Sequence, residues 1–319
     1  MFSLKSFIRK LIPHKLLYLC RVMRSGKLKE YNAKVKHYKK DKNYIPSDLP
    51  LYLSVMAIAK NETPYIAEWI EYHLLVGVQN FFIYDNESTD NLKDYLEPYI
   101  KDGIVEYTYF PGKRQQVAAY NDAIQRYRYS SFWLAFIDID EFLTPVENET
   151  ISEFLRDFED VPGIEINQVW YGSSGHQKKT DGLVIERFKE HSCFDYPANR
   201  GVKSIVNPRH VFYMETGHVA NYFNGEYSVN TNKDKNIKGS LDRPALHDKM
   251  RRNHYGCKSL EEFTARIDLG RVSSPGKLSV DEFYNRDRNE IKNDTIMDKY
   301  IQKVYDNINM RFGKQYFSY

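Results

Sequence analysis

Three acidic side chains follow directly after the most apolar segment of the chain. Residues 131–137 carry no formal charge and are rich in aromatic and branched side chains, which is typical of a strand buried on both faces. Asp138, Asp140 and Glu141 come next. Because residues two apart in an extended backbone point the same way, Asp138 and Asp140 can present their carboxylates to one divalent cation. The alternatives are an acidic surface loop and acids that cap the next helix.

The segments before this strand alternate between strand and helix patterns. We predict strands over 51–59, 81–84 and 104–109, each followed by a helix. Repeated units of this length specify a parallel sheet with helices on both faces. Ligands of such sheets bind beyond the carboxyl ends of the strands, so the polar residues there should meet at one edge. The candidates at that edge are Asn61, Glu62, Asp85, Asn86, Lys113, Arg114 and Gln116.

Four motifs occur in an order and spacing that is more specific than any one of them alone. They are Ala-Lys-Asn-Glu at 59–62, Tyr-Asp-Asn-Glu-Ser-Thr-Asp at 84–90, Phe-Ile-Asp-Ile-Asp-Glu-Phe at 136–142 and His-Tyr at 254–255. Together they resemble the glycosyltransferase family 2-like and family 92 group. The resemblance implies a GT-A fold, which is an α/β architecture with a Rossmann-like, mostly parallel sheet flanked by helices and an Asp-x-Asp metal motif.

The resemblance also implies an activity. It indicates an inverting transferase that uses Mn²⁺ or Mg²⁺ and a nucleotide-sugar donor, such as a UDP-linked hexose like galactose. Asp140 would bind the metal, Asp138 would contact the ribose or the metal shell, and His254 or His218 would complete the coordination. The residues implied to hold the nucleotide are Asn61, Glu62, Asp85 and Asn86, with Lys113, Arg114 or Gln116 lining the same pocket.

Each of these residues also has a purely structural interpretation. Asn61 can simply shape the turn before a helix, Lys113 and Arg114 can be solvated charges, and a lone histidine such as His254 or His218 is often a core residue. A catalytically inactive nucleotide-sugar or glycan-binding module on the same fold is the second hypothesis. A metal-dependent phosphatase, whose chemistry also starts from an Asp-x-Asp motif, is the third.

An inverting mechanism further requires a carboxylate that deprotonates the acceptor hydroxyl opposite the leaving group. The candidates are Glu141, Asp181 and Glu186. We favour Glu186, although pairing with Arg187 would make it purely structural. The acceptor itself would be a glycan or a lipid-linked glycan of surface polysaccharide or lipopolysaccharide synthesis.

The chain divides into three predicted parts. Residues 1–45 form a basic amphipathic extension with no acid before Glu30, which favours contact of residues 1–30 with an anionic membrane surface. Packing of this extension on the core or on a partner is the alternative. Residues 46–275 would form the transferase domain. Residues 276–319 would form a helical appendage, with a basic interaction tail as the alternative.

Composition excludes several other classes of protein. The net charge is only +3, from 46 basic and 43 acidic residues, so the chain is not a polycation of the kind that binds nucleic acid. The 3 cysteines are odd in number and far apart, which argues against a disulfide framework and fits a reducing compartment. No run of eighteen apolar residues exists. We therefore expect a cytoplasmic protein, peripheral on the cytoplasmic membrane.

Overall fold

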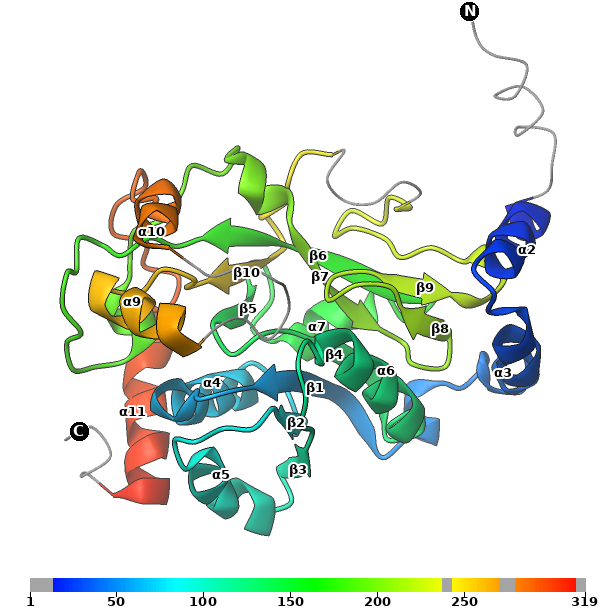
Figure 1. The fold of residues 1–319 in the computed structure, drawn as a ribbon, viewed down its shortest axis with the longest axis horizontal. Coiled ribbons are helices and arrows are strands. Elements are labelled where there is room, and N and C mark those ends of the chain that lie inside the picture. Colours follow the sequence, from blue (N-terminus) through cyan, green and yellow to red (C-terminus); the bar gives the residue numbers. More distant parts are fainter. Residues whose placement is uncertain (1–13, 237–242, 270–278, 314–319) are drawn as a thin grey trace, which may run out of the picture.

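The computed structural model describes residues 14–236, 243–269 and 279–313 (Figure 1). The first thirteen residues of the predicted N-terminal extension therefore lie outside the described part of the chain. An eight-stranded sheet forms the centre of the molecule. In spatial order its strands are β3 (Val105–Tyr109), β2 (Asn80–Asp85), β1 (Leu51–Ala59), β4 (Ser131–Phe136), β7 (Val202–Val206), β6 (Gly163–Trp170), β10 (Met250–His254) and β5 (Glu141–Pro145).

Half of this sheet, from β3 to β4, is parallel, as the alternating sequence pattern predicts. Three helices connect its strands: α4 (Thr63–Leu75), α5 (Leu92–Lys101) and α6 (Gln116–Arg126). Pro64 lies in the first turn of α4, where a missing backbone N–H costs nothing. Gly77 follows the helix with a positive φ of 97°, a conformation that favours glycine.

The other half of the sheet is mixed. Strand β7 is antiparallel to both of its neighbours, β10 is parallel to β6, and β5 is antiparallel to β10. Only residues 137–140 separate β4 from β5 along the chain, and the backbone N–H of Glu141 donates to the carbonyl of Asp138 to close a turn there. Four strand spacings of about 4.8 Å would place β4 and β5 roughly 19 Å apart in a flat sheet. The sheet must therefore curl, which brings the two strands together around this turn.

Helices cover both faces of the sheet. One hydrophobic core cluster lies between the sheet and the helices α4, α5, α7 (Ile151–Arg156) and α11 (Asp298–Phe312). A second cluster lies between the sheet and α6. Tyr300, Val304 and Ile308 of α11 are buried in the first cluster, at the helical spacing seen in the sequence. Other helices after the N-terminal region are α8 (Val184–Arg187), α9 (Leu260–Leu269), α10 (Val280–Arg286), and the 3-10 helices η1 (Pro46–Asp48), η2 (Pro197–Arg200) and η3 (Phe223–Gly225).

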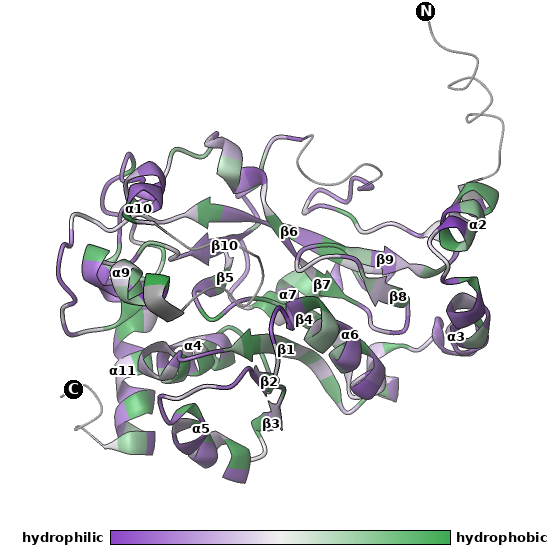
Figure 2. Ribbon diagram, in the orientation of Figure 1, coloured by the Kyte–Doolittle hydropathy of each residue, from purple (hydrophilic) through white to green (hydrophobic). Residues whose placement is uncertain are grey.

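Two N-terminal helices, α2 (His14–Arg24) and α3 (Leu28–Asp41), pack beside a hairpin formed by β8 (Val211–Met214) and β9 (Ala220–Tyr222). Three tyrosine hydroxyls tie the helices to this region: Tyr18 donates to Asn221, Tyr31 to Asn224 and Tyr38 to Glu226. Figure 2 shows hydrophobic and hydrophilic residues mixed along α2. Within the described ranges, no helix is both long and apolar enough to cross a membrane.

The mixed α/β sheet flanked by helices confirms the predicted fold class. The boundaries predicted for the three parts of the chain, at residues 45 and 275, stay predictions. The turn that joins β4 to β5 carries the acidic triplet, so the curl of the sheet places these acids where its two halves meet.

Candidate active site

Asp138 lies at the end of β4 and is held from two sides. Its Oδ1 accepts a hydrogen bond from Gln116 Nε2 at 2.9 Å, and its Oδ2 accepts one from Lys203 Nζ at 2.9 Å. Lys203 points from β7 and is almost fully buried. Burial alone would lower the pKa of Lys203, but the carboxylates of Asp138 and Glu141 raise it above its usual value. Burial likewise opposes ionisation of Asp138, whose pKa Lys203 nevertheless holds below its usual value.

Asp140, Glu141 and His254 form a cluster of potential metal ligands. One ligand atom from each lies within 4.8 Å of the other two. His254 Nε2 is 3.7 Å from Asp140 Oδ1. His254 is the last residue of β10 and pairs with Glu141, the first residue of β5, and Asp140 directly precedes Glu141. Burial opposes ionisation of Asp140, but His254 and then Arg266 hold its pKa well below the usual value. The predicted pairing of Asp140 with His254 is therefore present in the geometry.

The orientation of the His254 ring is fixed by Gln168 of β6. His254 Nδ1 lies 2.9 Å from Gln168 Oε1, which also accepts from Arg252 Nη2 at 2.8 Å. Gln168 Nε2 donates to the carbonyl of Ala198 at 2.6 Å, so the amide cannot turn over without losing these bonds. Gln168 thus presents only an acceptor to His254, whose Nδ1 must carry the proton. In the neutral ring the lone pair is then on Nε2, the nitrogen that faces Asp140, as metal coordination requires.

Glu141 plays a supporting part in this cluster. It is almost fully buried, its Oε1 forms an ion pair with Arg252 Nη1, and its Oε2 accepts from the backbone N–H of Asp138 at 3.0 Å. Both oxygens are therefore engaged inside the protein. This placement suits a residue that fixes the turn, and it does not suit a base that must reach an acceptor hydroxyl.

The residues predicted to hold the nucleotide lie at the predicted sheet edge, but several of them bond to neighbouring loops. Asp85 accepts from the backbone N–H of Ser88 at 2.8 Å and from the Tyr107 hydroxyl at 2.7 Å. The side-chain amide of Asn86 donates to the carbonyls of Phe110 and Gly112. Both side chains are buried, so they give this edge its shape.

The loop after β1 shows a similar arrangement. Asn61 has a positive φ of 56°, and its Oδ1 accepts from the backbone N–H of Thr89 at 2.7 Å. Glu62 is half-buried; burial raises the pKa of its carboxyl, against the opposing effects of Lys258 and Arg266. Lys113 and Arg114 are exposed.

A cavity of about 810 Å³ opens beside the metal-ligand cluster. Its walls are the start of α4, the loop from β2 to α5, the segment 179–187 and α9. The residues that line it are Asn61, Thr63, Pro64, Tyr65, Glu68, Thr89, Asp90, Asn91, Tyr95, Lys179, Thr180, Asp181, Gly182, Leu183, Val184, Arg187, Glu261, Glu262, Ala265 and Arg266. Arg266 belongs both to this wall and to the cluster, because its Nη1 donates to Asp140 Oδ2 at 3.1 Å. The cavity and the cluster are therefore parts of one site.

Two buried carboxylates hold the cavity wall 179–187 in place. Glu68 of α4 accepts from the backbone N–H groups of Val184 and Ile185 at 2.8 and 2.9 Å, and burial raises its pKa to about 7. Glu262 of α9 forms a two-pronged ion pair with Arg187 at 2.8 and 3.0 Å. The wall is thus anchored to helices on both sides of the cavity.

The structure separates the predicted bases and histidines. Asp181 is exposed on the cavity wall, whereas Glu186 is exposed elsewhere and bonds to the Tyr305 hydroxyl of α11. Glu186 is not among the residues that line the cavity. His218 is also exposed, with Nδ1 at 2.9 Å from the Val202 carbonyl, and it lies outside the ligand cluster that the described residues form. The geometry thus favours Asp181 and His254 over Glu186 and His218.

Sequence reasoning missed the cations and the amide that hold the acids. Lys203, Gln168 and Arg252 lie inside buried strands, and Arg266 comes from α9. A usable signal existed for Lys203, because a charged residue within an apolar strand such as 202–206 must be paired in the interior. The sequence does not say with which acid.

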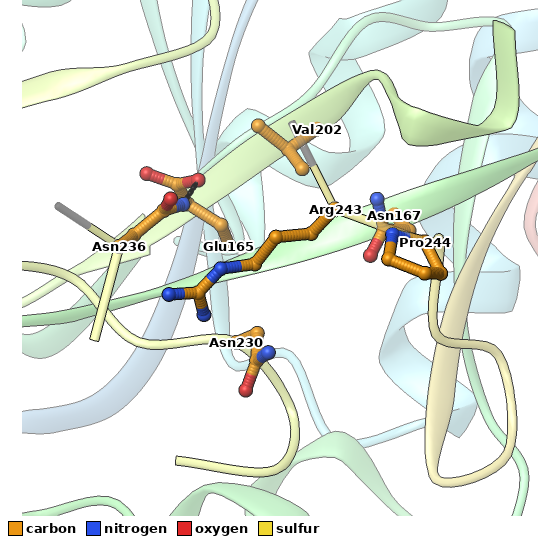
Figure 3. A pocket seen from close by; sticks show the side chains of 7 residues that line it. All are labelled: Glu165, Asn167, Val202, Asn230, Asn236, Arg243 and Pro244. Atoms are coloured by element: carbon orange, nitrogen blue, oxygen red, sulfur yellow. Dashed lines mark hydrogen bonds between the residues drawn. The ribbon is translucent and has the colours of Figure 1, made fainter. Parts of the chain in front are cut away.

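A second, much smaller pocket lies on the other side of β6 and β7 (Figure 3). Its volume is about 20 Å³, room for a single water molecule. Glu165 at its floor accepts from Ser228 Oγ at 2.6 Å and from Asn236 Nδ2. Burial raises the pKa of Glu165 to about 7, against the opposing effects of Ser228 and then Arg243. A pocket of this size cannot hold a sugar or a nucleotide.

The fold and the site together define an α/β protein with an acidic cluster of potential metal ligands and a cavity at the carboxyl edge of its sheet. The sequence model of glycosyltransferase family 92 matches residues 50–269, so the chain belongs to this family. The match contains β1, the acidic turn, His254 and α9.

Named relatives are consistent with this assignment. A glycosyltransferase family 92 protein of Oryza sativa subsp. japonica is 33% identical over 194 residues, which cover 54% of this chain and 33% of the relative. A galactan beta-1,4-galactosyltransferase of Arabidopsis thaliana is 29% identical over 180 residues, covering 50% and 34%. The matched regions thus span about a third of these relatives. The crystal structure of S. aureus TarS 1-349 is 15% identical with a TM-score of 0.37, covering 82% of this chain and 73% of that chain.

Proposed function

We propose that this protein is a metal-dependent, inverting glycosyltransferase that moves a hexose from a nucleotide-sugar donor to a glycan or glycolipid acceptor. The observation that carries the proposal is the Asp140–His254 pair, whose histidine is held in the ligating tautomer by Gln168. Membership of family 92 supports the transferase class.

The donor set fits Mn²⁺ or Mg²⁺. The carboxylates of Asp140 and Glu141 are hard ligands, and the imidazole nitrogen of His254 is a borderline ligand. Asp140 and His254 would hold the ion, while Glu141, paired with Arg252, keeps the turn in place. When bound, the ion would neutralise the charge that develops on the diphosphate leaving group. Asp138, Gln116 and Lys203 would fix the position of the ribose end of the donor. Asn61 and the buried Asp85 and Asn86 would shape the pocket for the base.

We assign the general base to Asp181. Its carboxylate stands on the cavity wall, where an acceptor hydroxyl can approach, whereas Glu141 is enclosed and Glu186 is outside the cavity. An acceptor bound in this cavity would donate its proton to Asp181 as it attacks the anomeric carbon. Asp181→Asn should lower kcat about 10²–10⁴-fold, the usual contribution of a general base, with less effect on donor affinity. Glu186→Gln is the matched control and should retain activity.

The sugar is proposed to be galactose from UDP-galactose, because several relatives bear the name galactan beta-1,4-galactosyltransferase. The acceptor would be a surface polysaccharide, a lipopolysaccharide core or another lipid-linked glycan. The test is a panel of nucleotide sugars with and without Mn²⁺, read first by thermal stabilisation and then by donor hydrolysis. Metal-dependent stabilisation by UDP-galactose above other donors supports the proposal. Binding without hydrolysis or transfer would favour the inactive module instead, and release of phosphate from simple phosphomonoesters would favour a phosphatase.

The cellular place of the protein is proposed to be the cytoplasmic face of a membrane. Helix α2 exposes Leu16 and Met23 next to Lys15, Arg21 and Arg24, a combination that suits an anionic lipid surface. The full chain should pellet with anionic liposomes at low salt and be released by high salt. If it stays in the supernatant at low salt, α2 is only a packing element.

A further inference from the structure

Arg266 has two roles in the geometry described above. Its guanidinium contacts Asp140 Oδ2 at 3.1 Å and donates to the carbonyl of Gly256 at 3.3 Å, and its side chain also lines the cavity. About a third of the side chain is exposed, so it is held by these contacts and is not enclosed. A positive charge is therefore held against the carboxylate that the proposed function gives to the metal.

A second cation lies beside it. Lys258 is almost fully buried, and its Nζ has no hydrogen-bond partner among the described residues. The Nζ lies 4.1 Å above the ring of Tyr65, another residue of the cavity wall. Burying an ammonium group without a hydrogen-bond partner costs free energy, so an anion bound next to Lys258 would be stabilising.

Three of the other acids at this edge already have their own cations, whereas Glu62 lies near Lys258 and Arg266 without an ion pair among the described residues. Asp138 pairs with Lys203, Glu141 with Arg252 and Glu262 with Arg187. A divalent cation on Asp140 and His254 would therefore meet Arg266 at short range, and like charges at such a distance repel strongly where water is scarce. It would also deprive Arg266 of the carboxylate of Asp140, while Lys258 has no carboxylate in direct contact among the described residues.

We infer that Arg266 competes with the divalent cation for Asp140 and, once displaced, joins Lys258 in binding the diphosphate of the donor. This inference rests on the proposed function, since it needs a metal and a nucleotide diphosphate at this site. It makes Arg266 a residue that exchanges partners, from a carboxylate of the protein to a phosphate of the substrate. The cation and the donor should consequently bind cooperatively. The cation takes Asp140 from Arg266, and the diphosphate of the donor gives the displaced Arg266 a new partner.

The test measures binding alone, with no turnover. Titration of Mn²⁺ into the full chain, followed by the electron paramagnetic resonance signal of the free ion, gives the metal affinity. Arg266→Gln should bind Mn²⁺ about tenfold more tightly than wild type, because a competing charge is gone. Calorimetry with UDP at saturating Mn²⁺ gives the second affinity, and there the same variant should bind about tenfold more weakly.

Two further variants serve as controls. Lys178→Gln removes one positive charge from a side chain that is 80% exposed near the same rim, and it should change neither affinity more than about twofold. Arg266→Lys keeps the charge and should bind Mn²⁺ nearly as wild type does. Circular dichroism of each variant checks that the fold is retained.

Opposite changes in the two affinities are the expected result. Equal or weaker Mn²⁺ binding by Arg266→Gln would overturn the inference while leaving the proposed metal site intact. Unchanged UDP affinity would overturn the second half, the transfer of Arg266 to the diphosphate. If wild type itself binds no Mn²⁺ at millimolar concentration, the metal requirement of the proposed function fails as well.

Discussion

The two halves of the central sheet contribute to the candidate site in different ways. In the parallel half, polar side chains such as Asp85 and Asn86 stand after the strands and bond to the backbone of adjacent loops. In the mixed half, Lys203, Gln168 and Arg252 stand within strands and bond to the acids and to His254. The parallel half therefore gives the site its shape, while the mixed half sets the charge of the site and the positions of its protons.

The largest effect should follow from removing a charge of the mixed half. Lys203→Met removes the buried cation that faces Asp138, whose side chain is 34% exposed, and the enclosed Glu141, so the free energy of unfolding should fall by about 3 kcal/mol. Urea denaturation at pH 7.5 measures it. Lys189→Met breaks a half-exposed pair with Asp298 and should cost less than about 1 kcal/mol. Similar losses of unfolding free energy in both variants would mean that the buried ion pair of Lys203 contributes no more to stability than the half-exposed pair of Lys189.

A somewhat smaller effect is expected where the two halves meet. Asp140→Asn should lower the rate of sugar transfer by about 10²–10³-fold with the fold intact, because a preorganised charge at the leaving group is lost. The activity of wild type should disappear with EDTA and return with Mn²⁺. Asp94→Asn, on the exposed side of α5, is the control. Full activity of Asp140→Asn in the presence of chelator would contradict the metal assignment.

Proton position provides the third test. His254→Ala and Gln168→Leu should each raise the Mn²⁺ concentration for half-activity by about 10–100-fold, and excess metal should partly rescue both. Gln168→Glu keeps an acceptor for His254 Nδ1 and for Arg252 but loses the donor to the Ala198 carbonyl, so its metal requirement should stay closer to wild type than that of Gln168→Leu. A core histidine would give another pattern, in which the melting temperature falls and the metal requirement does not change.

The smallest effect concerns Glu165, which lines the small pocket and not the cavity of the candidate site (Figure 3). Its pKa is about 7 in the folded protein, above its ordinary value of 4.5. Between these values the folded state holds a proton that the unfolded chain has lost, so stability decreases as pH rises. Relative to Glu165→Gln, wild type should lose about 1.2 kcal/mol of unfolding free energy between pH 5 and pH 6. Parallel stability curves for the two proteins would contradict the raised pKa.

The parallel half could be predicted from the sequence to within a few residues. Strand β1 occupies 51–59 as expected, because an apolar run followed by Thr63-Pro64 leaves little freedom in its end point. The acidic turn also followed from the apolar run that precedes it. These features depend on local patterns, which a single sequence contains.

The mixed half could not be predicted in the same way. The partners of Asp138 and Glu141 are 65 and 111 residues away along the chain, and they meet only because the sheet curls. Nothing local distinguishes Glu186, which points to Tyr305, from Asp181, which lines the cavity. Choosing between such candidates requires the register of strands and the path of loops, which are properties of the whole fold.

The three tyrosine bonds between the N-terminal helices and the β8–β9 region have a mechanical consequence. Tyr18, Tyr31 and Tyr38 link α2 and α3 at three separate points, and three points of attachment define a plane. The helices therefore cannot pivot on the catalytic body as a flexible tether would. In the proposed membrane contact of α2, the mouth of the cavity would be held at one fixed tilt to the lipid surface, which would limit how far from that surface an acceptor sugar can be and still be reached.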